Sequence, residues 1–187
     1  MDSQSKKIVL RWWQSMNLSA GGLKEKGIQP APSAHKARLK RCESADAVML
    51  SEGFRALWLG LGDEITETNS AENIECWASI AAVLVHIKTD NNLKLAQAAG
   101  RKTEGDKSTV SELRFSQLQN ARTPEDLLRR MRRIVQQLKG EVSVIHLAED
   151  IHQWFVEYRQ FRPRKADKRV SVQWAMDYYR AASAKNK

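Results

Sequence analysis

Apolar residues recur at every third or fourth position over much of this chain, which is the pattern of helices that bury one face. The clearest stripe joins Val144, Leu147, Ile151 and Tyr158, and a second runs over 127–138. Both stripes predict long amphipathic helices. Further helices are predicted over 9–16, 34–42, 52–61, 70–88, 93–99, 111–120 and 170–182.

Residues that commonly start and stop helices lie at the ends of the two clearest stripes. Ser143 precedes one stripe and Thr123 the other, and both side chains can cap a helix N-terminus. Pro124, which follows Thr123, suits a first helical turn. Gly140 and Pro163 come after the stripes, where such residues end helices. The sequence thus predicts the boundaries of these helices as well as their buried faces.

The fold class follows from the lack of strand and hairpin patterns between these predicted helices. No stretch alternates apolar and polar residues for long, and no Asn-Gly or Asp-Gly turn separates β-branched runs. Residues 80–85 are apolar nearly all round, which places their helix at the centre of a core. We therefore predict an all-α protein, a compact single-domain helical bundle of roughly eight to nine helices spanning 1–187. Loops are expected at 19–33, which holds two adjacent glycines and two prolines, and at 62–69 and 100–109.

Charge is distributed unevenly along the chain. The formal net charge is +9, from 31 Lys and Arg against 22 Asp and Glu. Residues 1–100 hold 12 basic and 11 acidic side chains, whereas residues 101–187 hold 19 basic and 11 acidic ones. A basic excess of this kind indicates a polyanionic partner such as nucleic acid or a membrane surface, although many ordinary domains are basic as well.

Other features of the sequence indicate the cellular compartment of the protein. The longest apolar run, 77–87, covers 11 residues and is broken by Ser79 and His86, whereas a membrane span needs about 20. The N-terminal stretch 1–11 lacks the apolar core of a secretory signal. Two cysteines, Cys42 and Cys76, suit a reducing compartment. We therefore expect a soluble cytoplasmic protein with no membrane partner.

The chain carries none of the usual catalytic, phosphate-loop or dinucleotide-binding motifs, and its acids are scattered. The prediction is a protein that is not an enzyme and binds no cofactor. Glu149 and His152 have the Glu-x-x-His spacing of di-iron bundles, which need two such pairs and two further glutamates. No second copy exists, so a solvated helix face is the favoured interpretation. A helical metal-dependent nuclease using these two residues is a separate hypothesis.

Basic residues gather in three places along the predicted helices. Helical spacing directs Arg129 and Arg133 away from the buried stripe and Arg132 to its flank. The other clusters lie at 38–41 and 162–169. Each cluster alone fits a solvated helix face, but three clusters unmatched by acids favour a surface that follows phosphates. Most of the six tryptophans fall on apolar stripes, so contact with nucleic acid should be mainly electrostatic.

An ordered set of short motifs runs through the chain from about residue 8 to residue 180. These motifs are Trp12-Trp13-Gln14, Ala37-Arg38-Leu39-Lys40-Arg41, Gly53-Phe54-Arg55-Ala56-Leu57-Trp58, Ser111-Glu112-Leu113-Arg114-Phe115, the arginine-rich 126–133, Leu147-Ala148-Glu149-Asp150 and Trp174-Ala175-Met176-Asp177-Tyr178-Tyr179. In this order they resemble the CasB family, the small subunit of the type I-E CRISPR Cascade complex.

The resemblance implies a non-catalytic, all-helical subunit present in two copies beside the backbone and large subunits of Cascade. It further implies that the subunit helps to hold the crRNA–target DNA heteroduplex and the displaced DNA strand, independently of sequence. Through the matching motifs, the resemblance assigns this nucleic-acid-binding role to Arg114 and Arg132. It assigns the same role to Lys40 and Arg41. Charge geometry adds Arg122, Arg129, Arg133, Arg164 and Lys165 as nucleic-acid-binding residues. The alternative is a scaffold whose basic faces meet acidic protein partners.

Overall fold

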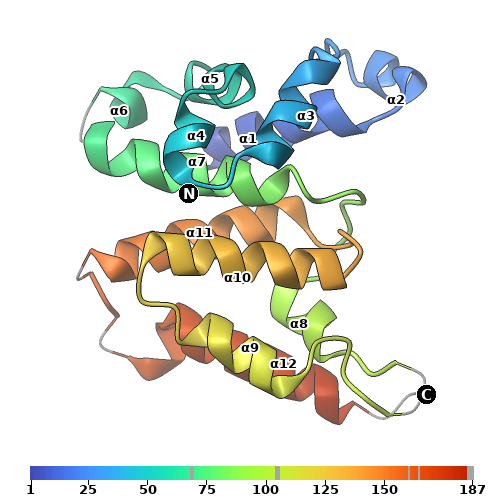
Figure 1. Ribbon diagram of the computed structural model, residues 1–187, viewed down its shortest axis with the longest axis vertical. Helices are drawn as coiled ribbons and strands as arrows, with labels where there is room; N and C mark the ends of the chain where they lie inside the picture. The colour runs from blue at the N-terminus through green and yellow to red at the C-terminus, as the bar shows by residue number, and fades with distance from the viewer. Residues whose placement is uncertain (68–69, 104–105, 160, 164, 185–187) are drawn as a thin grey trace. The chain divides into compact units, whose positions relative to one another are not determined.

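The computed structural model describes residues 1–67, 70–103, 106–159, 161–163 and 165–184. Within these ranges the chain forms twelve α-helices, one 3-10 helix and no β-strand (Figure 1), so the all-α prediction is confirmed. Eight of the described α-helices span seven residues or more, close to the predicted number. None of the described helices is long and apolar enough to cross a membrane.

Contacts within the chain group it into two units, Met1–Val85 and His86–Lys187. The first unit holds α1 Ser3–Asn17, α2 Ala20–Glu25, α3 Ser33–Arg41, α4 Ala45–Met49, α5 Glu52–Trp58, α6 Asp63–Thr66 and α7 Ser70–Leu84. The second holds α8 Leu95–Gly100, α9 Glu112–Gln119, α10 Pro124–Gln137, α11 Val144–Tyr158, the 3-10 helix Ala166–Lys168 and α12 Val170–Ser183. The prediction of a single domain over 1–187 stays a prediction.

In the first unit, α7 is the central helix. Its residues from Cys76 onward are all buried, and α3, α4, α5 and α6 pack against it. The apolar stretch 80–85 therefore lies in the core, as its pattern predicts. The helix ends at Leu84 rather than at the predicted residue 88. Beyond it, the backbone N–H groups of Lys88 and Thr89 donate to the Gly140 carbonyl at 2.9 and 3.1 Å, so this segment hydrogen-bonds across to another part of the chain.

Three short helices lie where the sequence predicts none. α2 occupies part of the predicted loop 19–33, α6 lies in the predicted loop 62–69, and α4 was not expected. A serine caps α2 and another caps α4: Ser19 accepts from the Gly22 N–H, and Ser44 accepts from the Ala47 N–H. Helices this short are marginal alone, and packing stabilises them once the core forms. Their apolar stripes are too brief to stand out in the sequence.

In the second unit, α12 lies against α8 and α9 (Figure 1). A Cβ atom built on Gly100 of α8 would lie 2.2 Å from the Tyr178 carbonyl oxygen, so only glycine allows this approach. The Tyr178 hydroxyl donates to the Val110 carbonyl at 2.7 Å, and its ring stacks on Phe115 with centroids 4.5 Å apart. These contacts hold α9 in place against α12.

The helix α10 shows the boundaries that the sequence predicts. Thr123 accepts from the Asp126 N–H at 3.2 Å, and Pro124 occupies the first turn. Beyond the helix end, Lys139 and Gly140 adopt positive φ angles of 57° and 77°. One face of α10 is buried, through Leu127, Leu128, Met131, Ile134 and Val135. The opposite face presents Arg129 and Arg133 to solvent.

Most tryptophans serve the core. Trp12, Trp13, Trp77, Trp154 and Trp174 are all buried, and Trp58 is half-buried. The Trp12 indole N–H donates to the Gly53 carbonyl at 2.8 Å, which ties α1 to α5. The expectation that most of these large rings anchor the core is therefore correct, and the five buried rings are not available as exposed stacking surfaces.

Candidate nucleic-acid interface

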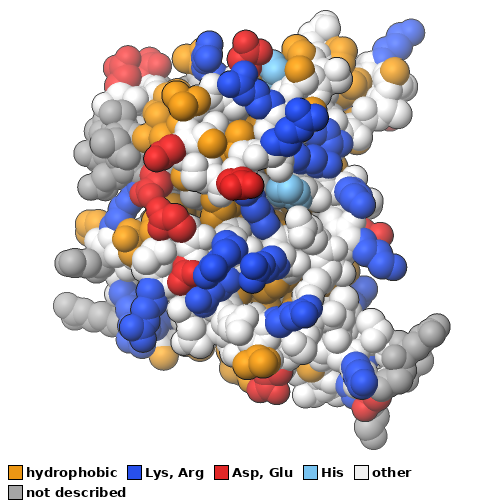
Figure 2. Space-filling view, in the orientation of Figure 1, with side chains coloured by type: hydrophobic (Ala, Val, Ile, Leu, Met, Phe, Trp, Pro, Cys, Tyr) orange, Lys and Arg blue, Asp and Glu red, His pale blue; other side chains and the backbone are white. Residues whose placement is uncertain are grey.

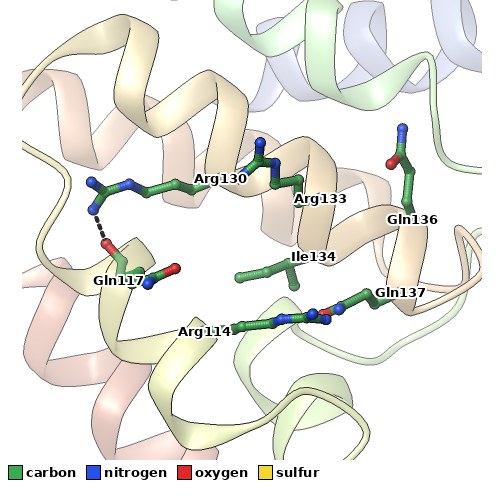
Figure 3. A pocket seen from close by; sticks show the side chains of 7 residues that line it. All are labelled: Arg114, Gln117, Arg130, Arg133, Ile134, Gln136 and Gln137. Carbon is green, nitrogen blue, oxygen red and sulfur yellow. Dashed lines mark hydrogen bonds between the residues drawn. The ribbon is translucent and has the colours of Figure 1, made fainter.

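A groove of about 470 Å³ runs between α9 and α10 (Figure 3). Its lining residues are Arg114, Gln117, Arg130, Arg133, Ile134, Gln136 and Gln137. Three of them are arginines, three carry a side-chain amide, and none is acidic. Figure 2 shows Lys and Arg side chains gathered over α10. The groove is therefore a concave surface of the second unit lined by cationic and amide side chains.

Two predicted residues, Arg114 and Arg133, come together at the groove although 18 positions separate them in the sequence. Arg114 extends from α9, whose neighbouring Phe115 and Leu118 anchor the helix in the core. Arg133 extends from the solvent face of α10. Both side chains are exposed, and neither forms a hydrogen bond or ion pair with any described residue. Their guanidinium groups are therefore available to an external anion.

Arg130, the third arginine of the groove, is held by the protein itself. One of its nitrogens donates to the Gln117 carbonyl (Figure 3), and the other lies 3.2 Å from an Asp126 carboxylate oxygen. Helical spacing places Arg130 on the flank of α10 but does not show that α9 lies there. The sequence prediction omitted this residue because nothing in the sequence pairs it with Gln117.

Asp126 also pairs with Arg129, whose guanidinium lies 2.6 Å from the carboxylate. The sequence interpretation held that the basic clusters lack matching acids, and for this cluster it is wrong. One carboxylate in the first turn of α10 offsets part of the charge of two arginines. Arg129 remains exposed but does not line the groove.

Two other predicted residues near these helices lie outside the groove. Arg132 is half-buried and interacts with other groups of the chain. Arg132 therefore also has a structural role within the chain, which helical spacing did not reveal. Arg122 is exposed in the turn between α9 and α10.

The first unit carries its own basic patch, formed by Arg38, Lys40 and Arg41 in the last turn of α3. All three side chains are exposed, and Figure 2 shows basic side chains over this helix. Arg38 and Arg41 line a shallow hollow of about 370 Å³, where His35 Nε2 lies 3.4 Å from a Glu52 carboxylate oxygen. Cations in the last turn also favour the helix dipole, so this patch has a structural reason to exist as well.

The third predicted cluster is only partly described. Arg164 lies outside the described residues. Lys165 is exposed at the start of the 3-10 helix Ala166–Lys168, and Arg162 and Lys168 are exposed nearby in the chain.

The residues of the nuclease hypothesis, Glu149 and His152, lie on α11. Both are half-buried and interact with other groups of the chain, rather than lying on the solvated face that the sequence favoured. Among the described residues, no three His, Cys, Asp or Glu side chains gather as a metal site requires. The structure therefore adds no support to the nuclease hypothesis.

Asp150, next to Glu149, has an unusual environment. Burial raises the pKa of its carboxyl group to about 7, while the Trp174 indole and the charge of Lys94 act in the opposite direction. Lys94 itself pairs with Asp177 of α12 at 3.1 Å. These groups come from the segment before α8, from α11 and from α12, so the carboxyl lies where three segments of the second unit meet.

Comparison with known proteins agrees with the ordered motifs. The family described as CRISPR-associated protein Cse2 matches residues 35–179, a stretch that includes most of α3 and every helix from α4 to α11. No curated protein and no solved structure matches the chain significantly. The matched stretch covers well over half of the sequence and all of the predicted site residues. The chain therefore belongs to the Cse2 family, the CasB family that forms the small subunit of the type I-E Cascade complex in CRISPR defence.

Proposed function

We propose that this protein is the non-catalytic small subunit of a cytoplasmic, RNA-guided bacterial defence complex. In this role it binds crRNA, target DNA and the displaced strand through Arg and Lys contacts to phosphates, and so stabilises the R-loop. We also propose that two copies act side by side with the backbone and large subunits. The observation that carries the proposal is the groove between α9 and α10, where Arg114 and Arg133 have no partner among the described residues.

The chemistry of these groups suits phosphate. A guanidinium group presents parallel N–H donors that match two phosphate oxygens, and it stays charged at any physiological pH. Binding releases counterions from the nucleic acid, which favours association without reading the bases. In an RNA-guided complex, base pairing supplies the sequence specificity, so a protein subunit needs only to hold the backbone. The basic patch on α3, through Lys40 and Arg41, adds contacts of the same kind.

The direct test is the salt dependence of binding. The purified protein should bind single- and double-stranded DNA and RNA weakly, and log K should fall with log salt with a slope of about −4 to −6, equivalent to roughly five to seven phosphates. Because Arg114 and Arg133 each neutralise one phosphate in this account, Arg114→Gln/Arg133→Gln should make the slope shallower by about 2. Fluorescence anisotropy at several salt concentrations measures both quantities.

A matched control has the same change in net charge outside the family match. Lys7→Gln/Lys24→Gln removes two exposed cations from α1 and α2, and it should leave the slope nearly unchanged. Binding that does not depend on salt would contradict the electrostatic account. An equal loss of slope in both double variants would show that net charge, rather than the groove, determines binding.

A further inference from the structure

The groove offers amide groups and an apolar surface that a phosphate alone cannot use. We infer that it receives the base of an unpaired nucleotide, with the phosphates of that nucleotide at the arginine rim. The inference rests on the proposed function, because it names the part of the nucleic acid that this site takes. The rim is formed by Arg114 on α9 and Arg133 on α10, and the amide side chains lie between and beside them (Figure 3).

The amides are the first argument for a base. Gln117, Gln136 and Gln137 each present an N–H donor and a carbonyl acceptor. An ionised phosphate only accepts hydrogen bonds, so it can use the donors but not the carbonyl oxygens. Nucleobases carry both donors and acceptors along their edges, and an amide pairs with them well. A groove with three amides therefore suits a base edge better than a phosphate alone.

Gln137 gives the second argument. Its Oε1 atom is covered from solvent and has no hydrogen-bond partner among the described residues. A buried acceptor without a donor destabilises the folded protein. In Figure 3 the Gln137 and Arg114 side chains extend toward one another along the groove. A ligand N–H that reached this oxygen would satisfy an acceptor that the fold leaves without a partner.

The size of the groove and its apolar floor, formed by Ile134, give the third argument for a base. Its volume of about 470 Å³ falls within the range of roughly 300–1,000 Å³ that is typical of small-molecule pockets. Ile134 supplies an apolar surface in the lining, and the flat guanidinium groups beside it can stack on a ring. A lone phosphate or carboxylate fills little of this space and gains nothing from an apolar floor.

The charges exclude most other ligands. No acidic residue lines the groove, so a cationic ligand would face three guanidinium groups. An acidic peptide would satisfy the charges, and its backbone N–H groups could donate to the amide oxygens, but its carboxylates offer no flat ring to the apolar floor or the guanidinium groups. A nucleotide combines negative charge, N–H donors and a flat ring in one ligand. It is the chemical class that uses every part of the lining.

The experiment compares a short thymidine strand with a strand of the same length in which every base is absent. Both carry the same phosphates, so phosphate contacts alone predict equal affinity. We expect the protein to bind the abasic strand about five- to tenfold more weakly at the same salt concentration, in line with the loss of base contacts. In Gln136→Ala/Gln137→Ala, this difference between strands should disappear while the salt slope stays as in the unmodified protein.

A control variant is Gln119→Ala, on α9 like Gln117 but outside the groove lining, which should keep the preference for the strand with bases. Thermal melting checks that every variant folds. Equal binding of both strands by the unmodified protein would overturn the base site, yet a steep salt slope would leave the proposed function standing. Displacement of DNA by a glutamate-rich peptide together with equal binding of both strands would assign the groove to an acidic protein partner. Absence of binding to either strand would refute both proposals.

Discussion

Arginines that are neighbours in the sequence differ sharply in what surrounds them. Arg129 lies 2.6 Å from Asp126, whereas Arg133, one helical turn later, has no partner among the described residues. Arg132, between them, is half-buried and interacts within the chain. Residue type and spacing predict a basic helix face, but only the contacts separate the cations that are available to a phosphate from those that the fold already uses.

Asp126 limits the charge of this face, which leads to a prediction. Asp126→Asn releases Arg129 and Arg130 from their shared carboxylate and removes a negative charge beside the groove. DNA affinity at low salt should rise about two- to fivefold, as expected for an exposed ion pair. Stability should fall by about 0.5 kcal/mol because the first turn of α10 loses an acid. Anisotropy and urea denaturation measure the two effects.

The control for this variant is Glu125→Gln, which makes the same change in net charge on an exposed neighbour that forms no ion pair with any described residue. It should raise DNA affinity less than Asp126→Asn does. Similar gains from both variants would mean that net charge, and not the release of the two arginines, governs binding.

The raised pKa of Asp150 predicts how the free energy of unfolding changes with pH. Its pKa is raised to about 7 by burial, whereas an unfolded Asp titrates near 3.9. The folded state therefore holds this proton more tightly, so the contribution of Asp150 is fully present at acid pH and is lost as pH rises through 7. From pH 5 to pH 8 the loss should amount to about 2–3 kcal/mol of unfolding free energy.

Asp150→Asn removes this titration, so the variant should lose much less stability than the unmodified protein between pH 5 and pH 8. Urea denaturation at each pH measures the difference. An unchanged pH dependence in the variant would show that the carboxyl is ionised in the folded protein throughout this range. Glu149→Gln is the control: it removes a neighbouring carboxylate but keeps Asp150, so most of the pH dependence should remain.

Element boundaries were more predictable than element packing. Ser143 and Thr123 cap α11 and α10, as their positions predict, and Gly140 follows α10 with positive φ. The groove, by contrast, depends on α9 lying beside α10, and no local pattern specifies which helix faces pair. The Gly pair at 21–22 favoured a loop by propensity, yet α2 forms there because a serine cap and a buried leucine compensate.

Close helix packing predicts the effect of one glycine substitution. Gly100→Ala would place a methyl group 2.2 Å from the Tyr178 carbonyl oxygen, so α8 and α12 must move apart. The free energy of unfolding should fall by about 2–3 kcal/mol, the range of a strongly overpacked core site. Gly21→Ala, whose added Cβ meets nothing within 4 Å, should be neutral or stabilising by up to about 1 kcal/mol. Denaturant titration compares the two, and equal effects would contradict this account of the packing.

At the scale of the whole molecule, basic residues of both units fall within the family match, from Lys40 and Arg41 on α3 to Lys165. In the proposed function these patches contact nucleic acid, whereas a scaffold would turn them toward acidic protein surfaces. Both roles use the same charges, so charge by itself does not separate them. Only the identity of the contacting molecule does.

Cross-linking in the assembled complex distinguishes the two roles. With crRNA and target DNA present, photo-cross-linking should join DNA or RNA to peptides that contain 129–133 and 38–41. Arg114→Gln/Arg133→Gln should reduce the adducts at α10 while leaving assembly intact. Adducts to protein subunits alone, with none to nucleic acid, would favour the scaffold.

The sequence by itself determined the fold class, the long helices with their caps, the burial of the tryptophans and the family. All of these follow from local periodicity, local capping chemistry or ordered motifs, which need no knowledge of distant residues. The tertiary structure decided which arginines are available, that Arg130 and three glutamines join Arg114 in one groove, and that Asp126 offsets two cations. Such pairings depend on how helix faces meet in space, and the period of a helix specifies its buried face but not its neighbour.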